Sequence, residues 1–140
     1  MSKKFVMPHI VFLEYINTIC QNPSVSAADT IVCIGRGGYI PGTYISHKTG
    51  IKEVYTIVAK SYTDDNMRGE LQFLQAPTLD DHNQKILIVD DIVDSGTSIV
   101  YPSKELIFAS VVYKEQSEFS DVVYGIVAPQ DEWVVFPWES

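Results

Sequence analysis

The chain of 140 residues is long enough for one ordinary domain and too short for two, so residues 1–140 should form one domain around a single core. Hydrophobic residues make up 46% and charged residues 20%, which excludes a disordered chain. The net charge of −8 disfavours a surface that binds nucleic-acid phosphates, because such surfaces cluster lysine and arginine.

The N-terminal part of the sequence predicts a helix and then a buried strand. Apolar side chains at helical spacing predict a helix over residues 8–20, and they are Phe12, Tyr15, Ile16 and Ile19. Residues 21–29 are typical of a turn. The continuous apolar run at 30–34 indicates a short strand that is buried on both faces.

A glycine-rich loop follows this strand at residues 35–38. Residues 39–49 can form a helix, and Gly50 can end it because glycine readily adopts the left-handed conformation found after a helix. A second strand is predicted at 54–59. The polar segment 60–69 has no hydrophobic period, so we expect it to be mobile.

The second half of the sequence predicts mainly strands. One covers residues 70–74, and a loop at 75–84 leads to the clearest buried strand, at 85–89. Further strands are predicted at 106–113 and 122–127. This alternation of strands with loops and short helices indicates an α/β fold with a mainly parallel sheet. Ligands of such sheets bind at the carboxyl ends of the strands, so the site should lie along that edge.

Neither a membrane span nor a secretory signal is expected, because the apolar runs stop after a few residues. Cys20 and Cys33 are the only cysteines, and Cys33 lies in an apolar run. A disulfide framework is therefore not expected, and a reducing, cytoplasmic setting fits best. The three histidines have no metal-site spacing.

The residues after the strand at 85–89 combine acidic, hydroxyl and glycine residues in one short run. Asp90 and Asp91 can accept hydrogen bonds from ribose hydroxyls or hold water on Mg²⁺. A phosphate can be surrounded by the N–H groups and hydroxyls of Ser95, Gly96, Thr97 and Ser98. Taken singly, these residue types are also common in turns and helix caps.

Residues 86–98 as one run resemble the binding motif for 5-phosphoribosyl 1-pyrophosphate (PRPP) of type I phosphoribosyltransferases, in which four apolar residues precede two acidic ones and a hydroxyl-rich loop. The resemblance implies the single-domain α/β fold of that family, a mainly parallel twisted sheet flanked by helices, with a small hood. It also implies an enzyme that joins the ribose phosphate of PRPP to a nitrogenous base.

Shorter segments between residues 31 and 139 resemble, in the same order, the bacterial xanthine-guanine branch of this family, which acts on 6-oxopurines. The segment similar to its pyrophosphate loop contains Arg36, Gly37, Gly38, Pro41 and Gly42. For this segment alone, an ordinary strand-to-helix turn with a surface arginine is an equally good interpretation.

The polar segment 60–69 is similar to the flexible catalytic loop of that branch. The resemblance implies that Lys60 and Arg68 contact PRPP and that Arg68 has a catalytic role. A loop that closes over the reactants would exclude water, which otherwise hydrolyses a ribosyl cation. Without the main motif, a plain exposed loop would be the better interpretation.

Two later segments are similar to the base-binding residues of the branch. Lys114 matches a lysine that contacts the exocyclic oxygen of the purine, where an ammonium donor favours an oxo over an amino group. Trp133 matches an aromatic residue that stacks on the base, and the Val134 backbone would contact the base edge. The alternatives are a solvated lysine and a core tryptophan, and Trp138 is assigned to packing.

The reaction that the resemblance implies is displacement of pyrophosphate from PRPP·Mg²⁺ by a purine nitrogen, in purine salvage. Asp94 would contact PRPP and lie near the imidazole edge of the purine as the general base. Asp91 and Asp90 would be the metal site. The family also implies a homodimer or higher homo-oligomer.

Several departures from the branch affect these expectations. Gly35 stands where serine is common, and Val135 stands where an acidic residue is common near the base, so base preference is the least determined property. Residues 99–105, interrupted by Pro102, are shorter than the usual helix, so one face of the sheet should be thinly covered or covered by a partner subunit. The sequence also ends at Ser140, where relatives usually continue.

Three other interpretations stay open. A PRPP-sensing regulatory protein with this fold would keep the phosphate loop and bind RNA or a protein partner, although the acidic charge weighs against RNA. An enzyme for orotate or another pyrimidine would share the fold, but Lys114 and Trp133 weigh against it. A purely structural relative would be expected to have lost parts of residues 90–98.

Overall fold

The computed structural model describes residues 3–61, 71–75, 85–94, 105–117 and 121–139, and for residues 58–61 and 71–75 it describes the backbone alone. The helices are α1 (His9–Cys20), α2 (Pro23–Ser26), α3 (Tyr39–Thr49) and the 3-10 helix η1 (Pro137–Glu139). The strands are β1 (Lys3–Val6), β2 (Thr30–Gly35), β3 (Val54–Ser61), β4 (Leu71–Gln75), β5 (Lys85–Val93), β6 (Glu105–Lys114), β7 (Val122–Ala128) and β8 (Glu132–Val135).

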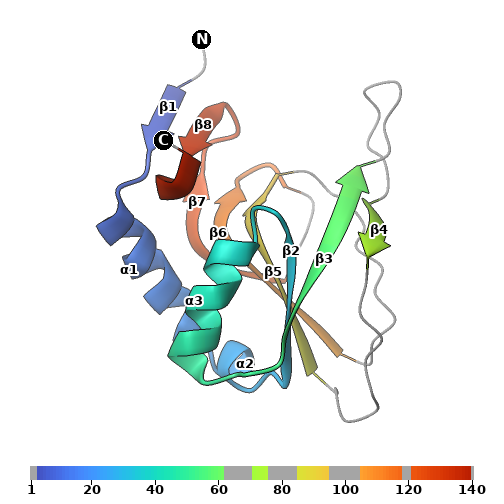
Figure 1. Ribbon diagram of the computed structural model, residues 1–140. Coiled ribbons are helices and arrows are strands. Elements are labelled where there is room, and N and C mark those ends of the chain that lie inside the picture. Colours follow the sequence, from blue (N-terminus) through green and yellow to red (C-terminus); the bar gives the residue numbers. More distant parts are fainter. Residues whose placement is uncertain (1–2, 62–70, 76–84, 95–104, 118–120, 140) are drawn as a thin grey trace.

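Among the described residues, six strands form one sheet in the order β4-β3-β2-β5-β6-β7. All neighbouring pairs are parallel except β3 and β4. The prediction of an α/β fold with a mainly parallel sheet is therefore confirmed. The carboxyl ends of β2, β5 and β6 meet at one edge of this sheet, which Figure 1 shows below the short strands β1 and β8.

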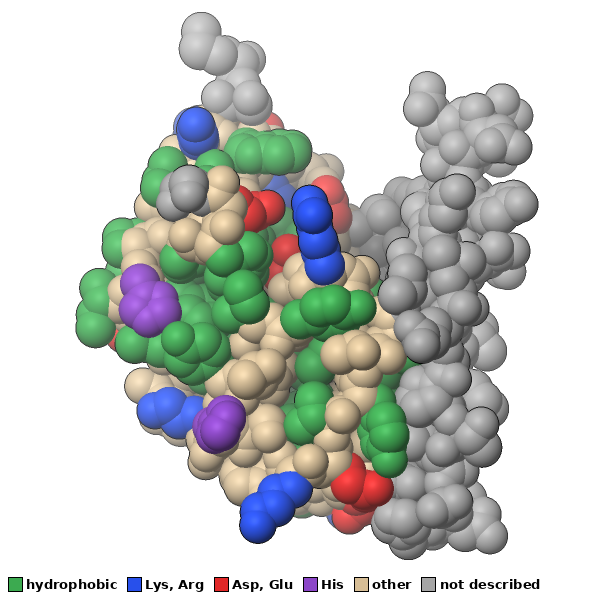
Figure 2. Space-filling model, viewed as in Figure 1, with side chains coloured by type: hydrophobic (Ala, Val, Ile, Leu, Met, Phe, Trp, Pro, Cys, Tyr) green, Lys and Arg blue, Asp and Glu red, His purple; other side chains and the backbone are tan. Residues whose placement is uncertain are grey.

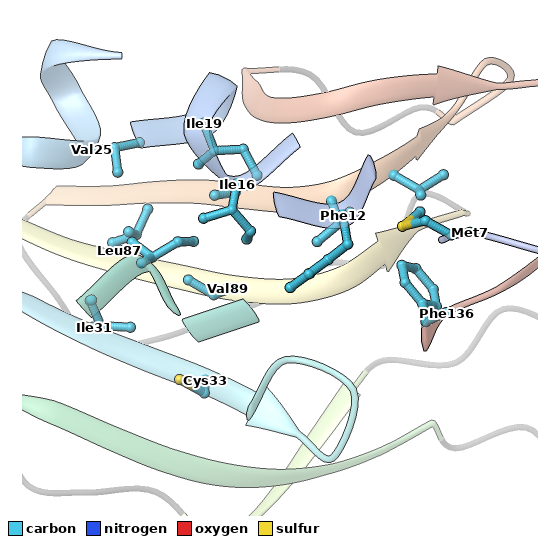
Figure 3. Packing of buried hydrophobic residues seen from close by; sticks show 14 of the residues in the cluster. Met7, Phe12, Ile16, Ile19, Val25, Ile31, Cys33, Leu87, Val89 and Phe136 are labelled. Carbon is cyan, nitrogen blue, oxygen red and sulfur yellow. The ribbon is translucent and has the colours of Figure 1, made fainter. Parts of the chain in front are cut away.

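The central strands are buried on both faces, because alternate side chains enter two different apolar clusters. On β5, Leu87 and Val89 pack with the helices, whereas Ile86 and Ile88 belong to the cluster on the opposite face. Figure 3 shows the first cluster, to which α1 contributes Phe12, Ile16 and Ile19. This two-sided burial explains why β2 and β5 are continuous apolar runs in the sequence.

The helices α1, α2 and α3 pack on the same face of the sheet. The α1 helix lies on β6 and β7, and α3 lies on β2, β3 and β5. Gly50 ends α3 as predicted, with a left-handed φ of 80°. No helix in the described ranges is long and apolar enough to cross a bilayer.

A short helix lies where the sequence predicted only a turn. Residues 23–26 form α2, because the Asn22 side chain accepts a hydrogen bond from the Ser24 N–H at 2.9 Å and Pro23 occupies the first helical position. Val25 of this helix is fully buried in the core. The turn predicted for 21–29 is thus wrong in its centre.

A second, two-stranded sheet stands apart from the main one. Strands β1 and β8 pair in parallel, from Lys3 opposite Glu132 to Val6 opposite Val135. Neither strand was predicted from periodicity, because each is only four residues long. We call this pair the hood sheet, and it corresponds to the small hood that the resemblance implied.

Strand β5 continues beyond its predicted end. It runs to Val93 instead of Val89, so the expectation that the two aspartates lie at the tip of the strand is wrong. The strand continues because β6 supplies partners, with Asp90 opposite Ser110 and Ile92 opposite Val112. The main sheet therefore fixes the backbone of both aspartates.

Three predicted features lie outside the described residues. They are the segment 62–69, the loop 76–84 and the short stretch 99–104 that contains Pro102.

Candidate active site

Two adjoining clefts lie at the carboxyl ends of the central strands. The larger, of about 720 Å³, is here called the loop cleft and is lined by Arg36, Gly37, Tyr39, Ile40, Asp91, Trp138 and Glu139. The smaller, of about 360 Å³, is here called the hood cleft and is lined by Asp91, Ile92, Asp94, Lys114, residues 130–134, Phe136 and Glu139. Because Asp91 and Glu139 line both, the clefts form one continuous site.

The loop cleft is built by the turn between β2 and α3. A side chain at position 37 would collide with the Asp91 carboxylate, and one at position 38 would collide with the carbonyl oxygens of Val89 and Ile34. Only glycines therefore let this turn lie directly against β5. The peptide bond between Gly35 and Arg36 is cis, and the Arg36 side chain is exposed.

The start of α3 lies beside the loop cleft. No side chain of the described residues caps its first turn, but the N–H groups of Gly38 and Tyr39 donate to the carbonyl oxygens of Ile34 at 2.8 Å and Arg36 at 3.1 Å. The helix therefore offers an anion the positive end of its dipole rather than these two N–H groups. Figure 2 shows acidic and basic side chains together on the upper part of this view, between the hood sheet and the turn after β2. The arrangement can accept a negatively charged group beside Arg36.

The two aspartates of β5 form a tightly packed acidic pair. Burial raises the pKa of Asp90 well above its usual range, and the charge of Asp91 raises it further. Burial also raises the pKa of Asp91. Hydrogen bonds to the Asp91 and Ile92 N–H groups, both 2.8 Å long, fix the two carboxylates. Such a pair gains from a cation or from hydroxyl donors of a ligand.

Lys114, at the end of β6, is only 5% exposed, so the alternative of a solvated lysine is wrong. Its ammonium group donates to the carbonyl oxygens of Pro129 at 3.2 Å and Gln130 at 3.4 Å, and also to that of Glu132. These contacts engage all three donors of the group. A purine oxygen would have to replace one of the carbonyls.

The tryptophans of the C-terminal segment lie in different surroundings. Trp133 lines the hood cleft and is 69% exposed, so the alternative of a core tryptophan is wrong. Val134 is buried in the same wall, whereas Val135 is not among the lining residues. Trp138 packs against Phe136 and edge-on against Phe12, as predicted, although it also borders the loop cleft.

Asp94 lies just after β5, on the hood cleft. Its carboxylate is exposed, and Oδ1 accepts a hydrogen bond of 2.5 Å from Nε2 of Gln130. The structure thus brings Asp94, Lys114, Trp133 and Val134 into one cleft, and Arg36, Gly37 and Asp91 into the other. Gly38 is buried and lines neither cleft.

Asp90 lines neither cleft, and the remaining predicted site residues lie wholly or by their side chains outside the described part of the chain. The side chain of Lys60, although its backbone lies in β3, and all of Arg68, Ser95, Gly96, Thr97 and Ser98 lie outside the described residues. For metal binding, no group of three or more His, Cys, Asp or Glu residues occurs in the described ranges. The two carboxylates of the acidic pair are oxygen ligands of the kind that Mg²⁺ takes together with water and substrate oxygens.

Sequence reasoning missed several residues of the clefts, among them Tyr39, Gln130 and Glu139. Each lies close in sequence to a predicted site residue, but none belongs to a residue pattern with an evident chemistry. Gln130 in particular contacts Asp94 across 36 positions of the sequence. Only the three-dimensional fold reveals such a contact.

Comparison with known proteins gives consistent results. Residues 21–140 match the family model described as the phosphoribosyl transferase domain. The chain is 30% identical to a xanthine-guanine phosphoribosyltransferase of Vibrio parahaemolyticus, over 99% of this chain and 91% of that protein.

Solved structures resemble the fold closely. The xanthine-guanine-hypoxanthine phosphoribosyltransferase of Helicobacter pylori superimposes with a TM-score of 0.75 at 29% identity, covering 97% of this chain and 94% of the other. A purine phosphoribosyltransferase of Pyrococcus horikoshii superimposes with a TM-score of 0.78 at 22% identity, covering 98% and 95% of the two chains. The similarity thus extends over nearly the whole chain.

Proposed function

Since the chain belongs to the phosphoribosyl transferase domain family, we propose that it transfers the 5-phosphoribosyl group of PRPP to a 6-oxopurine base, with release of pyrophosphate. The base is xanthine, guanine or hypoxanthine, and the product is the nucleoside monophosphate of purine salvage. The protein is a pentosyltransferase. The observation that carries the proposal is the pair of adjoining clefts, which share Asp91 between a loop suited to an anion and a wall with an exposed tryptophan.

The loop cleft would bind the pyrophosphate part of PRPP. The exposed guanidinium of Arg36 and the backbone at Gly37 would stabilise the charge of the leaving group, and the predicted contact of Gly38 would require its N–H to leave the Ile34 carbonyl oxygen. Lys60, Arg68 and residues 95–98 stay predicted contacts of PRPP, with a catalytic role for Arg68. Asp91 and Asp90 would hold Mg²⁺ through water or directly. When bound, this ion neutralises charge on the pyrophosphate oxygens.

The hood cleft would bind the purine. Trp133 would stack on the ring, the Val134 backbone would contact its edge, and Lys114 would donate to the exocyclic oxygen after releasing a carbonyl. A ring nitrogen then forms a bond to the anomeric carbon as the bond from that carbon to pyrophosphate breaks. Asp94 accepts the proton that the ring nitrogen loses, and the nearby carboxylates stabilise positive charge on the ribose.

The test is to mix the protein with PRPP and Mg²⁺, add guanine, xanthine, hypoxanthine, adenine or orotate separately, and measure pyrophosphate release. Release is expected with one or more 6-oxopurines and not with adenine or orotate. Asp94→Asn should lower the rate about 100-fold or more, since general base catalysis contributes that much. Asp121→Asn is the matched control, because Asp121 is exposed and lies outside both clefts.

The regulatory alternative is less well supported. A PRPP-sensing protein would need the loop cleft, but it would not need a second cleft with an exposed aromatic wall. PRPP binding without pyrophosphate release from any base would favour it over the enzyme.

Two further expectations accompany the proposed function. Strand β7, at the edge of the main sheet, exposes Tyr124, Ile126 and Val127, which supports the expected homodimer or higher homo-oligomer. Sedimentation velocity would measure that state.

Cys20 and Cys33 are free thiols, which supports the expected cytoplasmic setting.

A further inference from the structure

The hydrogen bond between Gln130 and Asp94 joins two parts of the chain that lie 36 positions apart in the sequence. Gln130 lies in the turn between β7 and β8, and Asp94 follows β5. The Gln130 Nε2 donates to Asp94 Oδ1 at 2.5 Å. We propose that Gln130 is a positioning residue, which holds the Asp94 carboxylate in the orientation needed to accept a proton from the base. This inference rests on the proposed function.

The backbone of Gln130 is firmly anchored. The buried Lys114 ammonium donates to the carbonyl oxygens of Pro129, Gln130 and Glu132, and the Glu132 N–H donates to the Pro129 carbonyl at 3.1 Å. The turn therefore has little freedom to move. A side chain that projects from it is a fixed reference point for a more mobile group.

Asp94 needs such a reference point. It is exposed and lies one residue beyond the last residue of β5, so the ladder of the sheet does not hold it. Within the described part of the chain, the Gln130 amide is the only hydrogen-bond donor that contacts its carboxylate. Loss of that donor would let the carboxylate rotate away from the hood cleft.

The orientation of the Gln130 amide supports this assignment. Its Oε1 is buried and has no hydrogen-bond partner among the described residues, which is an unfavourable state for an acceptor. Turning the amide over would place that oxygen 2.5 Å from a carboxylate oxygen, and two acceptors would then repel each other. In the observed orientation the amide Nε2 therefore donates to Asp94, and Oε1 is left without a hydrogen-bond partner among the described residues.

The contact gives the two carboxylate oxygens of Asp94 different roles. Oδ1 is engaged by Gln130, which leaves Oδ2 for the purine. As the ring nitrogen uses its electron pair to bond the anomeric carbon, pyrophosphate leaves with the electrons of the breaking bond, and the ring proton moves to Oδ2. A carboxylate held within a narrow range of angles makes this transfer efficient.

The experiment is steady-state kinetics of three variants with PRPP, Mg²⁺ and the best base. Gln130→Met removes the donor at nearly constant length, and Gln130→Asn keeps the amide but is too short to reach Asp94. Both should lower kcat about 10-fold to 100-fold and leave KM for PRPP unchanged, since misplacement of a catalytic group costs that much. The matched control Gln21→Met, on an exposed residue after α1, should have wild-type kcat.

A double-mutant cycle then shows whether Gln130 acts through Asp94. Adding Gln130→Met to Asp94→Asn should produce no further loss of kcat, because the group that it positions is already absent. The same fold-loss in both backgrounds, or wild-type kcat in Gln130→Met, would overturn the inference. An inactive wild-type protein would instead refute the proposed function, so the two failures are distinguishable.

Discussion

The loop cleft and the hood cleft are built in different ways, although they share Asp91 and Glu139. The loop cleft is shaped by backbone, because glycines let the turn after β2 lie against β5. The hood cleft is shaped by side chains from β5, β6, the β7–β8 turn and β8. Backbone groups suit the phosphates that are common to every PRPP enzyme, whereas side chains can vary with the base.

This difference predicts that damage to the two clefts has separable effects. Changes at the loop cleft should affect folding and PRPP binding together, because the same glycines pack the main sheet. Changes at the hood cleft should weaken binding of the base more than binding of PRPP.

The largest effect is expected at Gly38. A methyl group there would collide with the carbonyl oxygens of Val89 and Ile34. These atoms belong to the backbone of the two central strands, so they can move away only if the main sheet is distorted. Gly38→Ala should lower the free energy of unfolding by about 3 kcal/mol in urea titrations and abolish pyrophosphate release. Gly50→Asn is the control, because Gly50 has open space around it and asparagine tolerates its left-handed φ. Equal stability of the two variants would contradict this account of the loop.

Lys114→Met should be the next largest change. It leaves three carbonyl oxygens of the β7–β8 turn without their common donor, so unfolding should become easier by about 2 kcal/mol. Calorimetry should find weaker binding of the base and nearly unchanged binding of PRPP. The exposed Lys52→Met variant should match the wild type in both measurements. Equal losses for PRPP and base would mean that the two clefts are not separable.

Trp133→Ala should have a narrower effect. The ring is 69% exposed, so its removal should leave the melting temperature within error of the wild type. Loss of stacking should raise KM for the base roughly 10-fold to 100-fold. Tyr124→Ala, which removes an exposed aromatic ring outside both clefts, should leave KM unchanged. A melting temperature that falls without a change in KM would assign Trp133 to the fold.

The sequence predicted the loop side of the site better than the hood side. The turn at 35–38 and the acidic pair are contiguous with buried strands whose apolar runs are easy to identify, so local patterns located them, although the acidic pair lies inside β5 and not at its tip. The strands of the hood sheet are four residues long and pair across most of the chain, from Lys3 to Glu132, so no local period indicates them.

The same limit applies to single contacts. Lys114 was identified as a site residue through a family resemblance, but its three carbonyl partners come from a turn that the sequence did not define. The extension of β5 to Val93 also depended on partners in β6. Pairing between distant segments, unlike periodicity, leaves no trace in one sequence.

The smallest effect tests Asp90, the neighbour of the aspartate that lines both clefts. Burial, and then the charge of Asp91, raise the pKa of Asp90 well above its usual range, so folding is opposed once this group ionises. In metal-free buffer, Asp90→Asn should therefore stabilise the protein by about 1 kcal/mol at neutral pH. The gain should shrink as the pH falls through the raised pKa of Asp90 and disappear only below about 4, where the aspartate is protonated in both the folded and unfolded states.

The same variant should bind PRPP·Mg²⁺ more weakly, since a carboxylate near the metal and the ribose is lost. Asp121→Asn, at an exposed position, should show neither change in urea titrations and calorimetry. A gain in stability together with a loss of binding would mean that the Asp90 carboxylate contributes to binding of PRPP·Mg²⁺ and lowers the stability of the folded protein. A loss of stability at neutral pH would show instead that Asp90 supports the end of β5, beside the aspartate that lines both clefts.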